Sequence, residues 1–220
     1  MSLTKNALPV SGPAAPHRRT GLSSSLLLLL LLAGLGALGA PARASQAIES
    51  RADSLRARLD LHPSEFETAV ALGDELYLEG LRDDAEAAYR TALALQPDAA
   101  AAHIKLGVVL NESGDSEGAI AEFDRALAQN PENVEAICRR GQALYALRRY
   151  DEAVDHYRKA MAIDGRSQLA HYLLGIAFAD AGIYQEAIRE WQNVVEVDPE
   201  SESGRTAREG IEVLKSIVNQ

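Results

Sequence analysis

The stretch AAAHIKLGVVLNESGDSEGAIAEFDRALAQNPEN, residues 100–133, decides the fold because its spaced skeleton recurs on both sides of it. Three kinds of residue return every 34 positions, namely a glycine, an alanine and an aromatic ring. They are Gly73, Gly107, Gly141 and Gly175, then Ala85, Ala119, Ala153 and Ala187, then Tyr89, Phe123, Tyr157 and Trp191. A fixed period of this length predicts an array of stacked units.

The order of residues inside one unit indicates what kind of unit it is. The order is clearest in residues 100–133, where it consists of Leu106, Gly107, Leu110, Ala119, Phe123, Ala126 and Pro131. It resembles the tetratricopeptide repeat, in which 34 residues form two helices joined by a turn. The resemblance implies an all-α fold, a right-handed solenoid of helix pairs.

The period also divides the chain into parts. The expected parts are a lone helix at 45–65, repeats at 66–99, 100–133, 134–167 and 168–201, and a C-terminal capping helix at 202–220. The lone helix resembles the second half of an incomplete repeat. The last helix should present Ala207, Ile211, Leu214 and Ile217 on one face, which would cover the end of the array.

Small residues at the glycine and alanine places allow two helices to approach closely, and the ring fills the space between neighbouring pairs. The third repeat departs from the pattern twice. Arg148 stands where the other repeats have a turn glycine, so this turn must avoid a positive φ or accept strain. Arg140 replaces a leucine, so we expect it to reach outward or to pair with a nearby acid.

The first 44 residues differ in composition from the remainder. They contain four basic residues, no acidic residue and the leucine run Leu26–Leu32, and they end in Ala42, Arg43 and Ala44. This pattern predicts an export signal that is cleaved after Ala44; the alternative is an uncleaved single-pass anchor in the inner membrane. Either would place the repeats outside the cytoplasm, in the periplasm or another extracytoplasmic space.

Residues 45–220 carry 18 basic and 32 acidic residues, a net charge of minus 14. Such an acidic part disfavours nucleic acid as a partner, because phosphate contacts need a basic surface. We expect contact with a membrane only through the N-terminal segment. The chain has one cysteine, Cys138, which excludes an internal disulfide and a multi-cysteine metal cluster.

Motifs for chemistry are missing from the sequence. It has no HExxH, glycine-rich phosphate loop or nucleophile elbow. We expect His103 and His171, at equivalent places, to be packed and hydrogen-bonded. Cys138 should be a small apolar filler; the alternative is that Arg139 and Arg140 lower its pKa. The sequence therefore predicts no catalytic residue, no cofactor and no metal; the alternative is an enzyme whose site follows no known motif.

In tetratricopeptide arrays the first helix of each pair lines a concave groove that holds a peptide or helix of a partner. Carried over place by place, the resemblance implies a groove formed by Val70, Asp74, Tyr77, Ile104, Lys105, Val108, Asn111, Cys138, Arg139, Gln142, Tyr145, Tyr172 and Ile176. This mixture of apolar, aromatic and hydrogen-bonding groups suits a peptide ligand. Of the basic clamp with which chaperone-binding members hold an acidic C-terminus, only Arg139 is present.

The sequence thus predicts a non-catalytic, protein-binding scaffold or adaptor of the cell envelope, of the exported bacterial type. A narrower alternative is a holdase-like subunit of a cytochrome-c maturation system or of another envelope assembly system. That alternative depends on the similar layout of a lone helix running directly into the first repeat.

Overall fold

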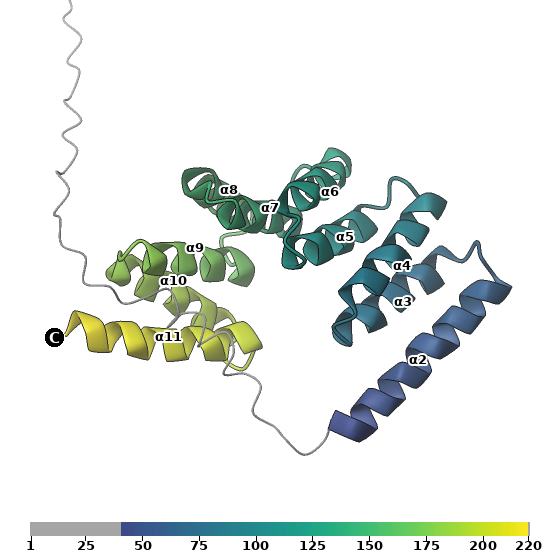
Figure 1. Ribbon diagram of the computed structural model, residues 1–220. Helices are drawn as coiled ribbons and strands as arrows, with labels where there is room; N and C mark the ends of the chain where they lie inside the picture. The colour runs from purple at the N-terminus through teal and green to yellow at the C-terminus, as the bar shows by residue number, and fades with distance from the viewer. Residues whose placement is uncertain (1–40, 220) are drawn as a thin grey trace, which may run out of the picture. The chain divides into compact units, whose positions relative to one another are not determined.

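The computed structural model describes residues 41–219, with side chains from residue 51 onward, and this part is a succession of helices (Figure 1). They are α2 (Pro41–Leu61), α3 (Phe66–Leu78), α4 (Arg82–Leu95), α5 (Ala100–Glu112), α6 (Ser116–Gln129), α7 (Val134–Ala146), α8 (Tyr150–Ile163), α9 (Gln168–Asp180), α10 (Tyr184–Val197) and α11 (Glu202–Val218). No β-strand occurs within residues 41–219. The all-α prediction is confirmed.

The helices stack as pairs in chain order. The first helices α3, α5, α7 and α9 each pack on the second helix of their own pair, and each second helix packs on the next first helix. Consecutive first helices also touch, α5 with α7, α7 with α9 and α9 with α11. In Figure 1, α6 and α8 lie on the outer side of this array, and α5 and α7 lie toward its inner side.

The repeating glycine makes room for the repeating ring. A Cβ added at Gly107 would lie 2.6 Å from Cε1 of Phe123, a separation too short for any real contact. The same approach is 2.5 Å between Gly73 and Tyr89, 2.6 Å between Gly141 and Tyr157, and 2.3 Å between Gly175 and Trp191. The four glycines therefore occupy equivalent helix crossings, as the period predicts.

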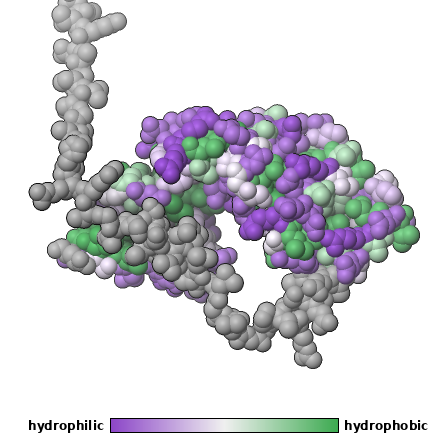
Figure 2. All heavy atoms as spheres, in the orientation of Figure 1, coloured by the Kyte–Doolittle hydropathy of each residue, from purple (hydrophilic) through white to green (hydrophobic). Residues whose placement is uncertain are grey.

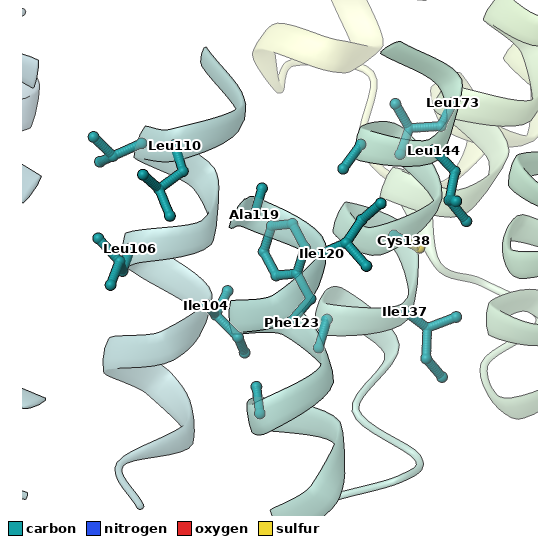
Figure 3. Packing of buried hydrophobic residues seen from close by; sticks show 14 of the residues in the cluster. Ile104, Leu106, Leu110, Ala119, Ile120, Phe123, Ile137, Cys138, Leu144 and Leu173 are labelled. Carbon is teal, nitrogen blue, oxygen red and sulfur yellow. The ribbon is translucent and has the colours of Figure 1, made fainter. Parts of the chain in front are cut away.

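The core runs through the array from one pair to the next. Figure 3 shows Phe123 and Ile120 on α6, with Ile120 extending toward Ile137 and Cys138 of α7. Phe123 and Ile137 are 1% and 0% exposed, and Cys138 is 0% exposed. Burial of this kind makes each unit depend on its neighbours, since no single helix pair can cover both of its faces.

Arg140 is accommodated by polar partners on both neighbouring second helices. Its Nε donates to Oδ1 of Asp124 on α6 at 2.7 Å, and its Nη1 donates to Nε2 of His156 on α8 at 2.7 Å. The expected pairing with a nearby acid is confirmed. The arginine that replaces the usual leucine thus joins three consecutive helices.

The turn inside each pair contains one residue with a left-handed backbone. Gly80, Gly114 and Gly182 have φ angles of 78°, 92° and 76°. Arg148 takes the same place in the third pair with a φ of 63°. Of the two outcomes that the sequence allows, the structure shows the strained one, which costs an L-residue about 1–2 kcal/mol.

Replacing Arg148 with glycine should therefore stabilise the protein. We expect a gain of about 0.5–1 kcal/mol in the free energy of unfolding, because relief of strain outweighs the extra freedom of glycine in the unfolded chain. Urea unfolding followed by circular dichroism measures it. The reverse change, Gly114→Arg, is the matched control and should destabilise; equal midpoints for all three proteins would contradict this account.

Two further helices close the ends of the array. On α2, Ala52 is 1% exposed, and Arg51 and Arg58 pair with Glu75 and Glu65 at 2.9 and 2.7 Å. On α11, Ala207, Ile211 and Leu214 are buried, as expected. Ile217 departs from this expectation because it is 45% exposed.

Helix α2 begins at Pro41, so it includes Ala42 and Ala44, which lie before the expected start of the lone helix. The remainder of the predicted export signal, including Leu26–Leu32, falls outside the described residues. Among residues 41–219, no helix is both long and apolar enough to span a bilayer.

Candidate functional site

Eleven of the thirteen predicted groove residues are partly exposed on the first helices. Ile104 and Cys138 are not, with exposures of 7% and 0%. The same place is half-buried at Val70 and Tyr172, in the first and last pairs, so neighbouring helices cover it only in the two middle pairs. Ile104 and Cys138 therefore belong to the core, and their assignment to the groove is corrected.

Helix α11 adds to this side of the array, which the sequence analysis missed. It begins 34 residues after α9 and contacts α9, so it follows the series of first helices. Counting by 34, Val213 takes the place of Tyr77 and Tyr145. Val213 and Ile217 are exposed by 41% and 45%. Extending the period past residue 201 could have identified Val213, and Ile217 follows it by four residues, about one helical turn.

We call the partly exposed side of the first helices the inner surface. It consists of Val70, Asp74, Tyr77, Lys105, Val108, Asn111, Arg139, Gln142, Tyr145, Tyr172, Ile176, Val213 and Ile217. Figure 2 shows that hydrophilic residues predominate on the opposite, outer side, over α6 and α8.

Asp74 organises the N-terminal part of the inner surface. One of its oxygens, Oδ1, accepts hydrogen bonds from the Tyr89 hydroxyl at 2.7 Å and from Lys105 Nζ at 2.7 Å. The carboxylate thereby joins α3, α4 and α5. Lys105 is the only lysine of the inner surface, and its ion pair with Asp74 compensates its charge.

Two tyrosines on the inner surface bridge consecutive first helices. The Tyr77 hydroxyl donates to Glu112 at 2.5 Å, and the Tyr145 hydroxyl donates to Asp180 at 2.5 Å. Burial, followed by the bond to Glu112, raises the pKa of Tyr77 to about 12. Burial and the bond to Asp180 raise the pKa of Tyr145 as well. Both phenols therefore remain neutral donors over the physiological pH range.

Arg139 on α7 is the least satisfied charge of the inner surface. Its Nη1 donates to Gln142 at 3.1 Å, and its Nε lies 3.9 Å from Glu135. Nε is buried and has no hydrogen-bond partner. The side chain is still 29% exposed, so a ligand on the inner surface can reach the guanidinium.

The two histidines are buried and bonded, as expected. His103 and His171 are 4% and 5% exposed. Each places Nδ1 2.6 Å from a glutamate, Glu122 or Glu190, and Nε2 near a backbone carbonyl oxygen. Within the described part of the chain, no group of three or more His, Cys, Asp or Glu side chains is placed to hold a metal ion.

Cys138 is an apolar filler. Burial raises the pKa of its thiol to about 12 and outweighs the opposing effects of the Ser167 hydrogen bond and of the Arg139 charge, so the pKa of Cys138 is not lowered overall. The thiolate is the reactive form. We therefore expect Ellman's reagent to label the native protein only slowly at mildly alkaline pH, and the guanidinium-unfolded protein at once. Rapid labelling of the native protein would mean that the contact between α7 and α9 opens readily.

Three comparisons with known proteins bear on this arrangement. A sequence model of the Tetratricopeptide repeat family matches residues 70–134, 111–167 and 138–202, which together span more than half of the chain. No curated protein sequence matches significantly.

Several solved structures share the fold. A crystal structure of MamA is 22% identical, with a TM-score of 0.60, over 74% of this chain and 96% of that one. YrrB, described as a TPR protein with an unusual peptide-binding site, is 18% identical, with a TM-score of 0.55, over 76% of this chain and 86% of that one. A tetratricopeptide repeat protein from Parabacteroides merdae ATCC 43184 is 22% identical, with a TM-score of 0.63, over 80% of this chain and 69% of that one.

Proposed function

This chain belongs to the tetratricopeptide repeat family, a family of protein-interaction scaffolds, and from that premise we propose that its inner surface binds a peptide segment or helix of a protein partner. One observation carries the proposal. Each of five successive helices, from α3 with Tyr77 to α11 with Val213, presents at least one partly exposed or exposed aromatic, apolar or hydrogen-bonding side chain on this side. A continuous surface of this kind suits an extended ligand.

Two features support a peptide as the ligand. The phenols of Tyr77 and Tyr145 are held by Glu112 and Asp180, so their rings are fixed before binding and lose little entropy when a partner arrives. YrrB, which is similar in fold, is described as having a peptide-binding site. Fixed aromatic groups with nearby polar atoms are common at protein interfaces.

The test uses two substitutions that introduce a positive charge on the inner surface and one substitution on the outer surface. Val108→Arg and Ile176→Arg alter partly exposed helix positions, whereas Lys159→Ala changes an exposed residue of α8. A partner captured by the wild type, identified by mass spectrometry and purified, should lose affinity for the two inner variants and retain it for the outer one. Equal affinity for all four proteins would exclude the inner surface as the binding site.

We also propose that the scaffold works in the cell envelope, outside the cytoplasmic membrane. The support is the sequence of the first 44 residues, with its basic start, leucine run and A-x-A ending. Mass spectrometry of the protein recovered from envelope fractions tests this. A mature terminus at Ser45 is expected after cleavage, an intact leader in the membrane fraction indicates an anchor, and recovery in the cytoplasm alone would contradict the proposal.

A further inference from the structure

Deepening the proposed function, on which this inference rests, we propose that one end of the inner surface holds a cationic side chain, a lysine ammonium or an arginine guanidinium, of the partner protein. Three residues form the site, which we call the cation site. They are Tyr145 near the end of α7, Tyr150 at the start of α8 and Asp180 at the end of α9. These three helices pack on one another.

The two tyrosines of the cation site form an open aromatic corner. The ring centroids of Tyr145 and Tyr150 are 4.8 Å apart, and the ring planes are inclined by 62°. The Tyr145 hydroxyl donates to Oδ2 of Asp180 at 2.5 Å, which fixes its ring beside the carboxylate. Tyr150 is 48% exposed, so much of its ring is accessible to a ligand. The negative face of such a ring attracts cations.

The carboxylate of Asp180 has acceptor capacity left for a ligand. Asp180 is exposed, and its Oδ2 accepts the hydrogen bond from Tyr145. Within residues 51–219 its side chain has no other hydrogen-bond partner and no ion pair. Ammonium and guanidinium groups are the donors that bind a carboxylate most strongly, so a cation suits both the carboxylate and the rings.

The first helix pair contains a closed version of the same arrangement. Two repeats before Tyr145, Tyr150 and Asp180, the chain has Tyr77, Arg82 and Glu112. There Oε1 of Glu112 accepts from the Tyr77 hydroxyl, and Oε2 accepts from Arg82 Nε at 3.2 Å. The chain itself thus supplies the cation to this carboxylate. In the third pair a tyrosine replaces the arginine, so the cation for Asp180 has to come from a partner.

The arginines closest in sequence do not supply this cation. Arg149 is bound to Glu152 through Nε and Nη2, both at 2.7 Å. Arg148 is exposed, and among the described residues it forms no ion pair with Asp180. Residues 45–220 have a net charge of minus 14, which favours the approach of a basic segment over an acidic one.

The experiment titrates the full chain with N-acetyl-arginine N-methylamide and with its neutral analogue, N-acetyl-citrulline N-methylamide. Tyrosine ring signals are followed by NMR and assigned with single tyrosine-to-phenylalanine variants. We expect the signals of Tyr145 and Tyr150 to shift, with a dissociation constant roughly tenfold lower for the arginine compound, because an exposed ring and an exposed carboxylate each contribute modestly. N-acetyl-lysine N-methylamide should also bind more tightly than the citrulline compound.

Variants with an unchanged circular dichroism spectrum locate the site. Asp180→Asn should abolish the preference for the arginine compound, and Tyr150→Arg should block the site because the chain then supplies the cation itself. Arg82→Tyr is the converse change and should open a second site, detected as a shift of the Tyr77 signal. Tyr184→Leu, at the place of Tyr150 in the fourth pair, is the matched control and should leave the preference intact.

Two results would overturn the cation site. One is a preference for arginine that persists in Asp180→Asn or is absent from the wild type. The other is a captured partner whose affinity is unchanged by both Asp180→Asn and Tyr150→Arg, since the partner would then not use the site. Failure of Val108→Arg and Ile176→Arg to weaken the binding of that partner would overturn the proposed function instead, whatever the capped amino acids show.

Discussion

Replacing Phe123 with alanine should lower the free energy of unfolding by roughly 3–5 kcal/mol, the usual cost of removing a buried aromatic ring. The ring is 1% exposed and lies directly against Gly107, the residue whose missing side chain makes space for it. Because Phe123 lies where α5, α6 and α7 meet, the cavity would weaken both the second helix pair and its contact with the third (Figure 3).

Urea unfolding followed by circular dichroism measures this loss. Phe123→Leu is the matched control, since leucine keeps most of the volume and should cost about 1 kcal/mol. In a linear array, a weakened central unit also reduces cooperativity, so a shallower transition for the alanine variant is expected. An alanine variant as stable as the leucine variant would show that the ring does not fill the crossing.

The residues of the core crossings could be predicted from the sequence for a simple physical reason. A Cβ added at Gly107 would lie 2.6 Å from Cε1 of Phe123, so this helix crossing admits only glycine. The crossing recurs in each helix pair, and glycine therefore recurs every 34 residues. The backbone conformation at Arg148 could not be predicted in this way. The sequence shows that the turn glycine is missing, but it does not show whether φ stays positive. The structure shows that the backbone stays left-handed.

The candidate site was harder to predict because exposure depends on neighbours. Ile104 and Cys138 hold the same place as Val70 and Tyr172, yet only the latter two reach the surface. The bond between Asp74 and Lys105 depends on side-chain conformations that no spacing encodes. The hydrogen bonds from Tyr77 and Tyr145 differ from that bond because their spacing is regular. In both cases the acceptor follows its tyrosine by 35 residues, and this spacing can be read from the sequence.

Replacing His103 with alanine is the second change with a large expected effect, roughly 3–5 kcal/mol, because it removes a buried ring and leaves two hydrogen-bond partners without it. The ring is 4% exposed, and its Nδ1 lies 2.6 Å from Oε2 of Glu122 on α6. Its Nε2 lies 2.7 Å from the carbonyl oxygen of Pro97, before α5. The ring thus lies between two oxygen atoms, one on each side.

The loss of stability arises mainly from the two groups that lose their hydrogen-bond partner when the histidine is removed. Without it, the Glu122 side chain, 11% exposed, keeps only the contact with Arg125, and the Pro97 carbonyl loses its donor. A double-mutant cycle of His103→Ala with Glu122→Gln separates these contributions in urea unfolding. We expect a coupling energy above about 1 kcal/mol, since the two residues touch. His171→Ala, which breaks the equivalent contact with Glu190, should behave alike. Additive effects of His103→Ala and Glu122→Gln would mean that the histidine acts through packing alone.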